Sequence, residues 1–95
     1  MIAFIPVLLA SALVQEVKKD VPYGELERQV LDIHAPKDAK NLPVVFWIHG
    51  GGWQVGDKSQ VKDKPKMYPD RGFVFVSTNY RLLPDATIRE MAGDV

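Results

Sequence analysis

The sequence contains no cysteine, and neither sign of charge dominates it. Without thiols the chain offers no disulfide, no thiolate nucleophile and no thiolate ligand for a metal ion. Its 12 Lys and Arg residues are balanced by 12 Asp and Glu residues, which gives a formal net charge of +0. No basic run is longer than Lys18-Lys19. The composition therefore predicts no nucleic-acid partner and no electrostatic attraction to an anionic membrane.

Long apolar runs are also scarce, and the longest is the N-terminal segment 2–14. It is too short to span a bilayer, which takes about 20 apolar residues. Its end, Ala10-Ser11-Ala12, has the small-x-small pattern that a signal peptidase accepts, although no Lys or Arg precedes the segment. We predict that residues 1–14 are the signal peptide of a secreted or periplasmic protein. The alternative is a cytoplasmic protein in which this segment is a strand or helix packed on the domain.

Two continuous apolar runs, residues 44–48 and 73–76, carry the main structural signal. They lack the alternation of a strand with one wet face, which is typical of parallel strands covered on both faces. Parallel strands need a crossover of about a dozen residues or more, and residues 56–71 are long enough to provide it. Residues 62–68 predict a short helix within this crossover, and Pro65 either limits it to one or two turns or lies in its first turn.

A strand pair and a helix are predicted on either side of these runs. Residues 29–34 form a short strand closed by a proline turn, with residues 17–23 as its hairpin partner. Thr87 and Glu90 have the spacing of a capping box, which predicts a helix start. The apolar side chains of this helix recur at helical spacing at Ile88, Met91, Ala92 and Val95. The chain stops inside the helix, which is typical of a truncated domain.

Two charged residues, Arg81 and Asp94, flank the connection from the second apolar run to this helix. An ion pair between them would lock the helix onto the strand end. Because exposed pairs contribute little to stability, the alternative that both side chains are solvated stays open at this point.

The most informative motif follows the first apolar run directly and reads His49-Gly50-Gly51-Gly52-Trp53. Three successive residues without a Cβ let backbone N–H groups approach a ligand closely and point the same way. Stabilising a developing negative charge requires donors of this kind. The alternative is a glycine-rich turn that simply lets the strand end sharply.

Four segments together carry a resemblance to a known fold. They are His49 to Trp53, Gly56-Asp57-Lys58, Asn79-Tyr80-Arg81-Leu82, and Pro84 through Asp94. Over residues 31–95 the sequence resembles the N-terminal third of an α/β-hydrolase, and it is most similar to esterases and lipases of the hormone-sensitive-lipase and feruloyl-esterase-like groups. The resemblance implies a partial α/β domain over residues 15–95. In it, an antiparallel N-terminal strand pair leads into a parallel sheet with flanking helices, truncated before the nucleophile strand.

The resemblance also assigns roles within the glycine motif. Gly51 and Gly52 would donate backbone N–H groups to the oxyanion of a tetrahedral intermediate, and losing one such donor typically costs about 100-fold or more in rate. His49 and Gly50 would shape the loop, and Trp53 would line the acyl or alcohol pocket. The implied substrate is a small-molecule ester or an esterified carbohydrate. No metal or organic cofactor is implied, because no His, Asp or Glu cluster has ligand spacing.

A hydrolase of this fold also needs Gly-x-Ser-x-Gly at a strand-to-helix elbow, followed by an acidic residue and then a histidine. None follows within the 95 residues. Ser11 lies in the leader, Ser59 in the crossover and Ser77 at the end of a buried strand. His34 and His49 precede the position of the nucleophile, and His34 is interpreted as a strand-end histidine without a chemical role. We therefore expect the chain to be inactive by itself.

Two other classes of function are weighed against an esterase fragment. Residues 51–59 match a phosphate-binding Gly-x4-Gly-Lys-Ser loop within one residue, but Asp57 displaces Lys58 and puts a carboxylate where phosphate oxygens would lie. The second alternative is a non-catalytic remnant or interaction domain. In the resembling fold the strand 44–48 would then form an exposed apolar edge, so self-association or aggregation of the chain is expected.

The export hypothesis predicts a shortened mature protein. When the chain is produced in a secreting host, the purified protein should begin at the end of the predicted signal segment 1–14 rather than at Met1, because signal peptidase cleaves after a small-x-small site such as Ala10-Ser11-Ala12. N-terminal sequencing checks this prediction. An intact Met1 on the mature protein would contradict export.

Overall fold

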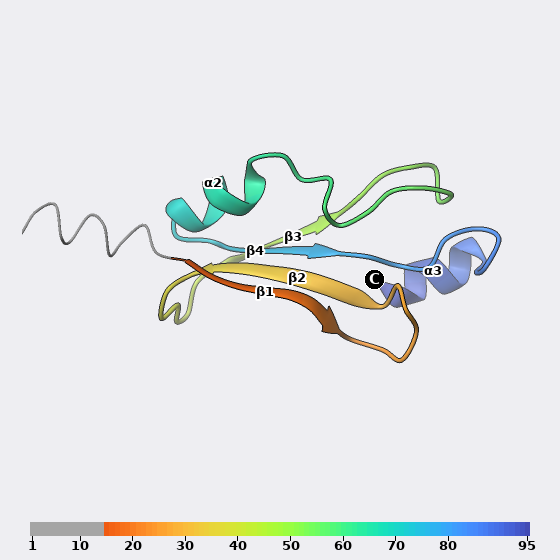
Figure 1. Cartoon of the computed structure of the whole chain (residues 1–95), viewed down its shortest axis with the longest axis horizontal. Coiled ribbons are helices and arrows are strands. Elements are labelled where there is room, and N and C mark those ends of the chain that lie inside the picture. Colours follow the sequence, from red (N-terminus) through yellow and green to blue (C-terminus); the bar gives the residue numbers. More distant parts are fainter. Residues whose placement is uncertain (1–14) are drawn as a thin grey trace, which may run out of the picture.

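The computed structural model describes residues 15–95, and the signal-peptide prediction for residues 1–14 lies outside them. In this part of the chain four strands form one mixed sheet in the order β1-β2-β4-β3 (Figure 1). The strands are β1 (Gln15–Pro22), β2 (Val30–Pro36), β3 (Val44–Ile48) and β4 (Val74–Thr78), and the helices are α2 (Lys64–Asp70) and α3 (Ile88–Asp94). No helix among the described residues has the length and apolar character needed to cross a membrane.

The first half of the sheet is the predicted hairpin. β1 and β2 pair antiparallel, and their register shifts between Lys18 and Val21. Asp20 lies within this irregularity and has a φ of 55°, a left-handed conformation that Asp adopts more readily than most residues. There the Asp20 carboxylate reaches Lys58 Nζ at 2.9 Å. The hairpin thus contacts the crossover that follows β3.

The second half of the sheet is parallel, as the two apolar runs predicted. β3 and β4 pair in register from Val44 opposite Val74 to Ile48 opposite Thr78, whereas β2 and β4 pair antiparallel. The crossover between β3 and β4 contains α2, and Pro65 occupies its first turn as expected. A proline at that position interrupts no helical hydrogen bond, because the first N–H groups of a helix have no partner within it.

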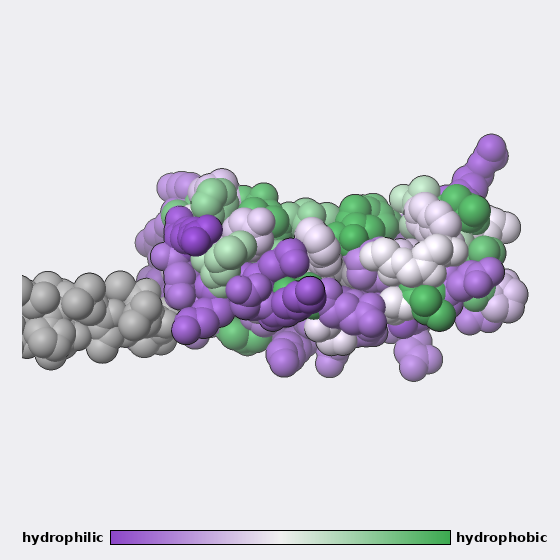
Figure 2. Space-filling view, turned by 90° about the horizontal axis from the view of Figure 1, so that it is seen from above, coloured by the Kyte–Doolittle hydropathy of each residue, from purple (hydrophilic) through white to green (hydrophobic). Residues whose placement is uncertain are grey.

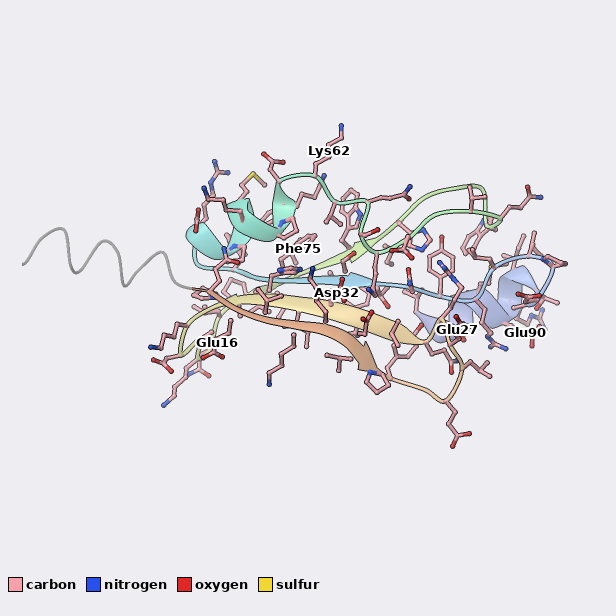
Figure 3. The ribbon with its side chains drawn as sticks, viewed as in Figure 1. Glu16, Glu27, Asp32, Lys62, Phe75 and Glu90 are labelled. Atoms are coloured by element: carbon pink, nitrogen blue, oxygen red, sulfur yellow. The ribbon has the colours of Figure 1, made fainter. Side chains whose placement is uncertain are left out.

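One face of the sheet is covered by α2. Phe75 of β4 lies opposite His34 of β2 and Val45 of β3, so these three side chains share a face. Tyr68 of α2 stacks on Phe75 at a ring-centroid distance of 5.6 Å, and Phe75 is fully buried beneath the helix (Figure 3). His34 lies inside β2 rather than at its end, and burial lowers its pKa.

A second small core lies beyond the carboxyl end of β4. Tyr80, Ala86 and Met91 pack together there and are almost completely buried. The predicted capping box of α3 is confirmed, because Glu90 N–H donates to Thr87 Oγ1 at 3.2 Å and Thr87 N–H donates to Glu90 Oε1 at 2.9 Å. Figure 1 shows that α3 lies at the end of the sheet and not over one of its faces.

The opposite face of the sheet is open at β3, which corrects the expectation that both faces are covered. Val44, Phe46 and Ile48 are 58%, 46% and 46% exposed, whereas the alternate residues Val45 and Trp47 are half-buried. The reason is that α2 packs on β2 and β4 from the other side, while α3 follows β4 at the sheet end. In the space-filling view, hydrophobic side chains gather along one long rim of the molecule (Figure 2).

The exposed residues of β3 predict that the 95-residue chain self-associates. Phe46→Lys should shift the chain toward a monomer of 10.7 kDa, because a charge on this face opposes the burial of apolar surface between copies. Size-exclusion chromatography with light scattering measures the mass. Leu26→Lys is the matched control, since Leu26 is 48% exposed but lies in the hairpin loop. A monomeric wild-type chain with a sharp, cooperative unfolding transition would contradict this prediction.

Candidate functional site

The glycine motif forms a tight turn at the carboxyl end of β3. The N–H groups of Gln54 and Val55 both donate to the carbonyl oxygen of Gly51, each at 3.2 Å. Gly51 has a φ of 130°, and a Cβ at this position would collide with the carbonyl oxygen of Val55. Gly52 has a φ of 64°, in the left-handed region that glycine adopts without strain. The shape of the turn therefore depends on glycine.

The amide N–H groups of Gly51 and Gly52 are not consumed by this turn. Among residues 15–95, neither group donates a hydrogen bond to a protein acceptor. A hollow of about 310 Å³ lies beside the turn. It is lined by Trp47, His49, Gly50, Gly51, Val55, Gly56 and Gln60. Gly51 thus borders the hollow, while Gly52 lies outside its lining.

His49 is held in one orientation at the start of the loop. Its ring stacks on Tyr80 with centroids 4.4 Å apart, and the Tyr80 hydroxyl donates to the carbonyl oxygen of His49 at 2.8 Å. His49 Nδ1 lies 2.9 Å from Gly50 O, and because a carbonyl oxygen only accepts, Nδ1 carries the hydrogen. His49 is 4% exposed, so the ring fixes the entry to the turn. Burial raises the pKa of Tyr80, which keeps its hydroxyl protonated as a donor.

Trp53 packs beside this pair. Its ring meets the Tyr80 ring edge-on at 5.7 Å, and its carbonyl oxygen accepts a hydrogen bond from Leu83 N–H at 2.9 Å. The side chain is 37% exposed and does not line the hollow beside Gly51. A role of Trp53 in a substrate pocket stays a prediction.

A residue that sequence reasoning missed, Arg28, binds the loop from the hairpin side. Its Nη2 donates to the carbonyl oxygen of Gly56 at 2.8 Å, and its Nε donates to that of Tyr80 at 2.9 Å. The same Nη2 lies 3.3 Å from Asn79 Oδ1 and 3.5 Å from His49 Nε2. The single sequence offers no signal for this role, because Arg28 is an ordinary charged residue in a hairpin loop and its acceptors lie far along the chain.

Asn79 connects the end of β4 to the segment after the glycine turn. Its Oδ1 accepts a hydrogen bond from Lys58 N–H at 2.8 Å, and its Nδ2 donates to Asp57 Oδ1 at 3.2 Å. Asn79 is 5% exposed, and both the oxygen and the nitrogen of its buried side-chain amide have hydrogen-bond partners. The segments Gly56-Asp57-Lys58 and Asn79-Tyr80, noted in the sequence only as part of a resemblance, are therefore bound to each other.

Lys58 forms an ion cluster with the buried Asp32 and the exposed Asp20. Its Nζ lies 3.0 and 3.1 Å from the two carboxylate oxygens of Asp32 and 2.9 Å from Asp20 Oδ1. Burial alone would lower the pKa of Lys58, but the hydrogen bonds and charges of the two carboxylates outweigh it and raise the pKa. The Ser77 hydroxyl donates to Lys58 O at 2.7 Å. With its ammonium group bound by two carboxylates, Lys58 is not free to contact a phosphate, which argues against the phosphate-loop alternative.

Comparison with known proteins identifies the family of this domain. The BD-FAE family matches the sequence over residues 31–95. The chain belongs to the BD-FAE family. An isoprenylcysteine alpha-carbonyl methylesterase of Arabidopsis thaliana is 28% identical over 92 residues, which is 96% of this chain and 22% of the relative. A kynurenine formamidase of Danio rerio is 31% identical over 83 residues, 86% of this chain and 28% of the relative.

A solved structure confirms the predicted fold. Esterase B from Lactobacillus rhamnosis superimposes with a TM-score of 0.73 and 27% sequence identity, covering 98% of this chain and 32% of the esterase. The sheet of mixed pairing with flanking helices is thus the one found in α/β-hydrolase esterases. The chain spans less than a third of the length of the curated relatives that it matches.

In this BD-FAE chain the ion pair of Arg81 with Asp94 is present. Arg81 Nε and Nη2 both donate to the Asp94 carboxylate at 2.9 Å, and Arg81 N–H also donates to it at 2.9 Å. Gln29 Nε2 adds a further hydrogen bond at 3.0 Å. The Asp94 side chain is only 3% exposed. The pair joins α3 to the end of β4, and the hydrogen bonds from Arg81 are the main cause that lowers the pKa of Asp94.

Asp94→Asn should destabilise the BD-FAE fold by about 1.5 to 3 kcal/mol at pH 7, because hydrogen bonds to a charged group contribute about that much. Since the folded pKa of Asp94 is depressed, this stability is present above the unfolded pKa near 4 and is lost as the pH falls through the folded value. The variant should therefore lose part of the acid dependence of stability. Urea unfolding at several pH values, in the Phe46→Lys background to limit association, measures both effects.

The control for this prediction is Glu90→Gln. Glu90 lies 3.5 Å from Arg81 and is 50% exposed, and Gln preserves the capping box. Exposed pairs contribute little to stability, so the control should differ little from the parent. If both substitutions lowered the free energy of unfolding equally, the Arg81–Asp94 pair would contribute no more to stability than the exposed Arg81–Glu90 pair, which would contradict the prediction.

Proposed function

We propose that this chain is the N-terminal part of a serine hydrolase of carboxylic esters and supplies its oxyanion-binding loop, with the amide N–H groups of Gly51 and Gly52 as donors. The observation that carries the proposal is the glycine turn, which uses Gly51 O internally while the two amides make no hydrogen bond within residues 15–95. Membership of the BD-FAE family and relatives named as a methylesterase and an esterase support the same reaction class.

The chemical role of the loop follows from where charge develops. When a nucleophile attacks an ester carbonyl, the carbonyl oxygen becomes negative only on the way to the tetrahedral intermediate. Donors that are already oriented stabilise that charge without reorganising, so they lower the barrier rather than tighten ground-state binding. The anchoring of His49 by Tyr80, through a stacked ring and a 2.8 Å hydrogen bond, supports such a fixed orientation.

The Gly-x-Ser-x-Gly motif that would carry the nucleophile does not occur in residues 1–95. In the α/β-hydrolase fold the nucleophilic serine, the acid and the histidine follow this region in the chain. Ser77 does not replace the nucleophile, because its hydroxyl is buried and donates to Lys58 O. Ser59 lies in the crossover, and its N–H donates to Asp57 at 2.9 Å. The 95-residue chain alone is therefore expected to be inactive.

The proposed substrate is a small-molecule ester or an esterified carbohydrate. A lipid ester belongs to the same reaction class, and the choice between them depends on acyl and alcohol pockets outside this region. Trp53, exposed beside Tyr80, is the side chain of this region proposed to contact the substrate. The export inferred from residues 1–14 would place this chemistry outside the cytoplasm.

A non-catalytic interaction domain is the second candidate. The observation that favours it is the exposed apolar face of β3, formed by Val44, Phe46 and Ile48. Such a face suits association with another polypeptide. Expression of the whole reading frame that contains residues 1–95 distinguishes the two candidates. An esterase hydrolyses an ester, whereas a non-catalytic interaction domain does not.

The esterase proposal is tested with p-nitrophenyl acetate. A polypeptide that continues past Val95 to a Gly-x-Ser-x-Gly elbow should hydrolyse it, and Gly51→Ala should lower kcat about 100-fold or more, because the added Cβ displaces a donor amide. Gly93→Ala is the control, since a Cβ at Gly93 meets no atom within 4 Å. A reading frame without the elbow, or a Gly51→Ala enzyme as active as the control, would refute the proposal.

A further inference from the structure

We propose that Arg28 is the positioning residue of the glycine loop. Within residues 15–95 it makes no hydrogen bond to Gly51 or Gly52, yet its guanidinium group donates to a backbone oxygen at the closing end of the loop and to another after the neighbouring strand. One acceptor is Gly56 O at 2.8 Å, just after the turn, and the other is Tyr80 O at 2.9 Å, just after β4. One side chain from the β1–β2 loop thus joins the end of the turn to the segment after the neighbouring strand, beside the direct contacts of Tyr80 with His49 and of Leu83 with Trp53.

The contact at Gly56 acts on both ends of the turn. Gly56 has a φ of 120°, and a Cβ there would collide with Gly50 O and with the His49 ring. The backbone of Gly56 therefore lies directly against the residues that begin the turn. By holding Gly56 O, Arg28 holds the closing end of the loop against its opening end.

The contact at Tyr80 completes the arrangement. Tyr80 binds His49 through its ring and its hydroxyl, so the opening end of the loop is anchored to the residue whose backbone oxygen Arg28 also holds. Arg28 Nη2 further lies 3.3 Å from Asn79 Oδ1. The acceptors surround one planar group, and a guanidinium ion presents several donors in a rigid fork.

Lysine does not replace this geometry. Its ammonium group is a compact point charge on a flexible stem, whereas Gly56 O and Tyr80 O are bound by different nitrogens of the Arg28 guanidinium. Arg28 is also partly withdrawn from solvent, with a side chain 28% exposed, and lies 3.7 Å from the Asp57 carboxylate. The positive charge of Arg28 is thus balanced by Asp57, the residue that follows Gly56 in the chain.

The positioning is tested by hydrogen–deuterium exchange on the 95-residue chain. The reporters are the amides of Gln54 and Val55, which close the turn, and that of Lys58, which binds Asn79. In Arg28→Ala their exchange should be about tenfold faster or more, because charge-assisted hydrogen bonds hold the loop against local opening. Arg28→Lys should give an intermediate increase.

Two controls separate positioning from general stability. Arg81→Gln removes an arginine of similar exposure, 24%, and should raise exchange in α3 but not at the three reporters. Guanidinium ion at millimolar concentration should restore slow exchange at the reporters in Arg28→Ala, whereas urea, which is neutral and of similar shape, should not. If Arg28→Ala does not fold, Arg28→Lys decides the test.

Unchanged reporter exchange in the Arg28 variants would overturn the proposal, and so would an increase spread evenly over all strands. Exchange requires no ester turnover, so this outcome is separate from the fate of the proposed function. The catalytic consequence does rest on that function. In the longer hydrolase Arg28→Lys should lower kcat about tenfold with KM within about twofold, because the loop donors act in the transition state. An unchanged kcat in an active hydrolase would overturn the catalytic part.

Discussion

The parallel pairing of β3 with β4 is the constraint on which the candidate site depends. Because the two strands run in the same direction, the residues after Ile48 and after Thr78 emerge at the same edge of the sheet. Tyr80 can therefore reach back to His49, with a stacked ring and a hydrogen bond to its backbone oxygen. The glycine turn is anchored by the neighbouring strand, which leaves the amides of Gly51 and Gly52 outside its internal hydrogen bonds.

A buried polar network holds the segment after the turn. An unpaired ammonium or amide would be costly inside a protein, but Lys58 binds two carboxylates and Asn79 is bonded on both sides. These contacts join the hairpin, the crossover and the end of β4. Arg28 adds a second connection between the same three elements. The order of the site thus comes from polar contacts at the edge of the sheet, and not from a large apolar core.

The apolar core, by contrast, is incomplete on one side. α2 packs on β2 and β4 and buries Phe75 beneath Tyr68, while Val44, Phe46 and Ile48 on the opposite face of β3 stay about half exposed. The chain covers 32% of the esterase that it superimposes on. All five residues of β3 are apolar and suited to burial, but residues 15–95 cover only one face of this strand.

Local patterns in the sequence determined the elements of this protein and the place of its glycine turn. The apolar runs indicated parallel strands, Pro65 indicated a helix start, and Thr87 with Glu90 indicated a capping box, because each of these signals acts between neighbours in the chain. The resemblance of residues 31–95 then indicated the fold. The sequence also allowed the pairing of Arg81 with Asp94, but left it undecided against solvation.

Only the tertiary structure decided which distant groups meet. Arg28 is separated from Gly56 and Tyr80 by 28 and 52 positions, and Lys58 from Asp32 by 26, so no local periodicity carries information about these contacts. The tertiary structure also decided that one face of β3 is open. An apolar run indicates that a strand can be buried, but it does not indicate whether another element packs on each face. Both outcomes have the same physical reason: strand order and crossover direction bring chain segments together, and these are properties of the whole sheet.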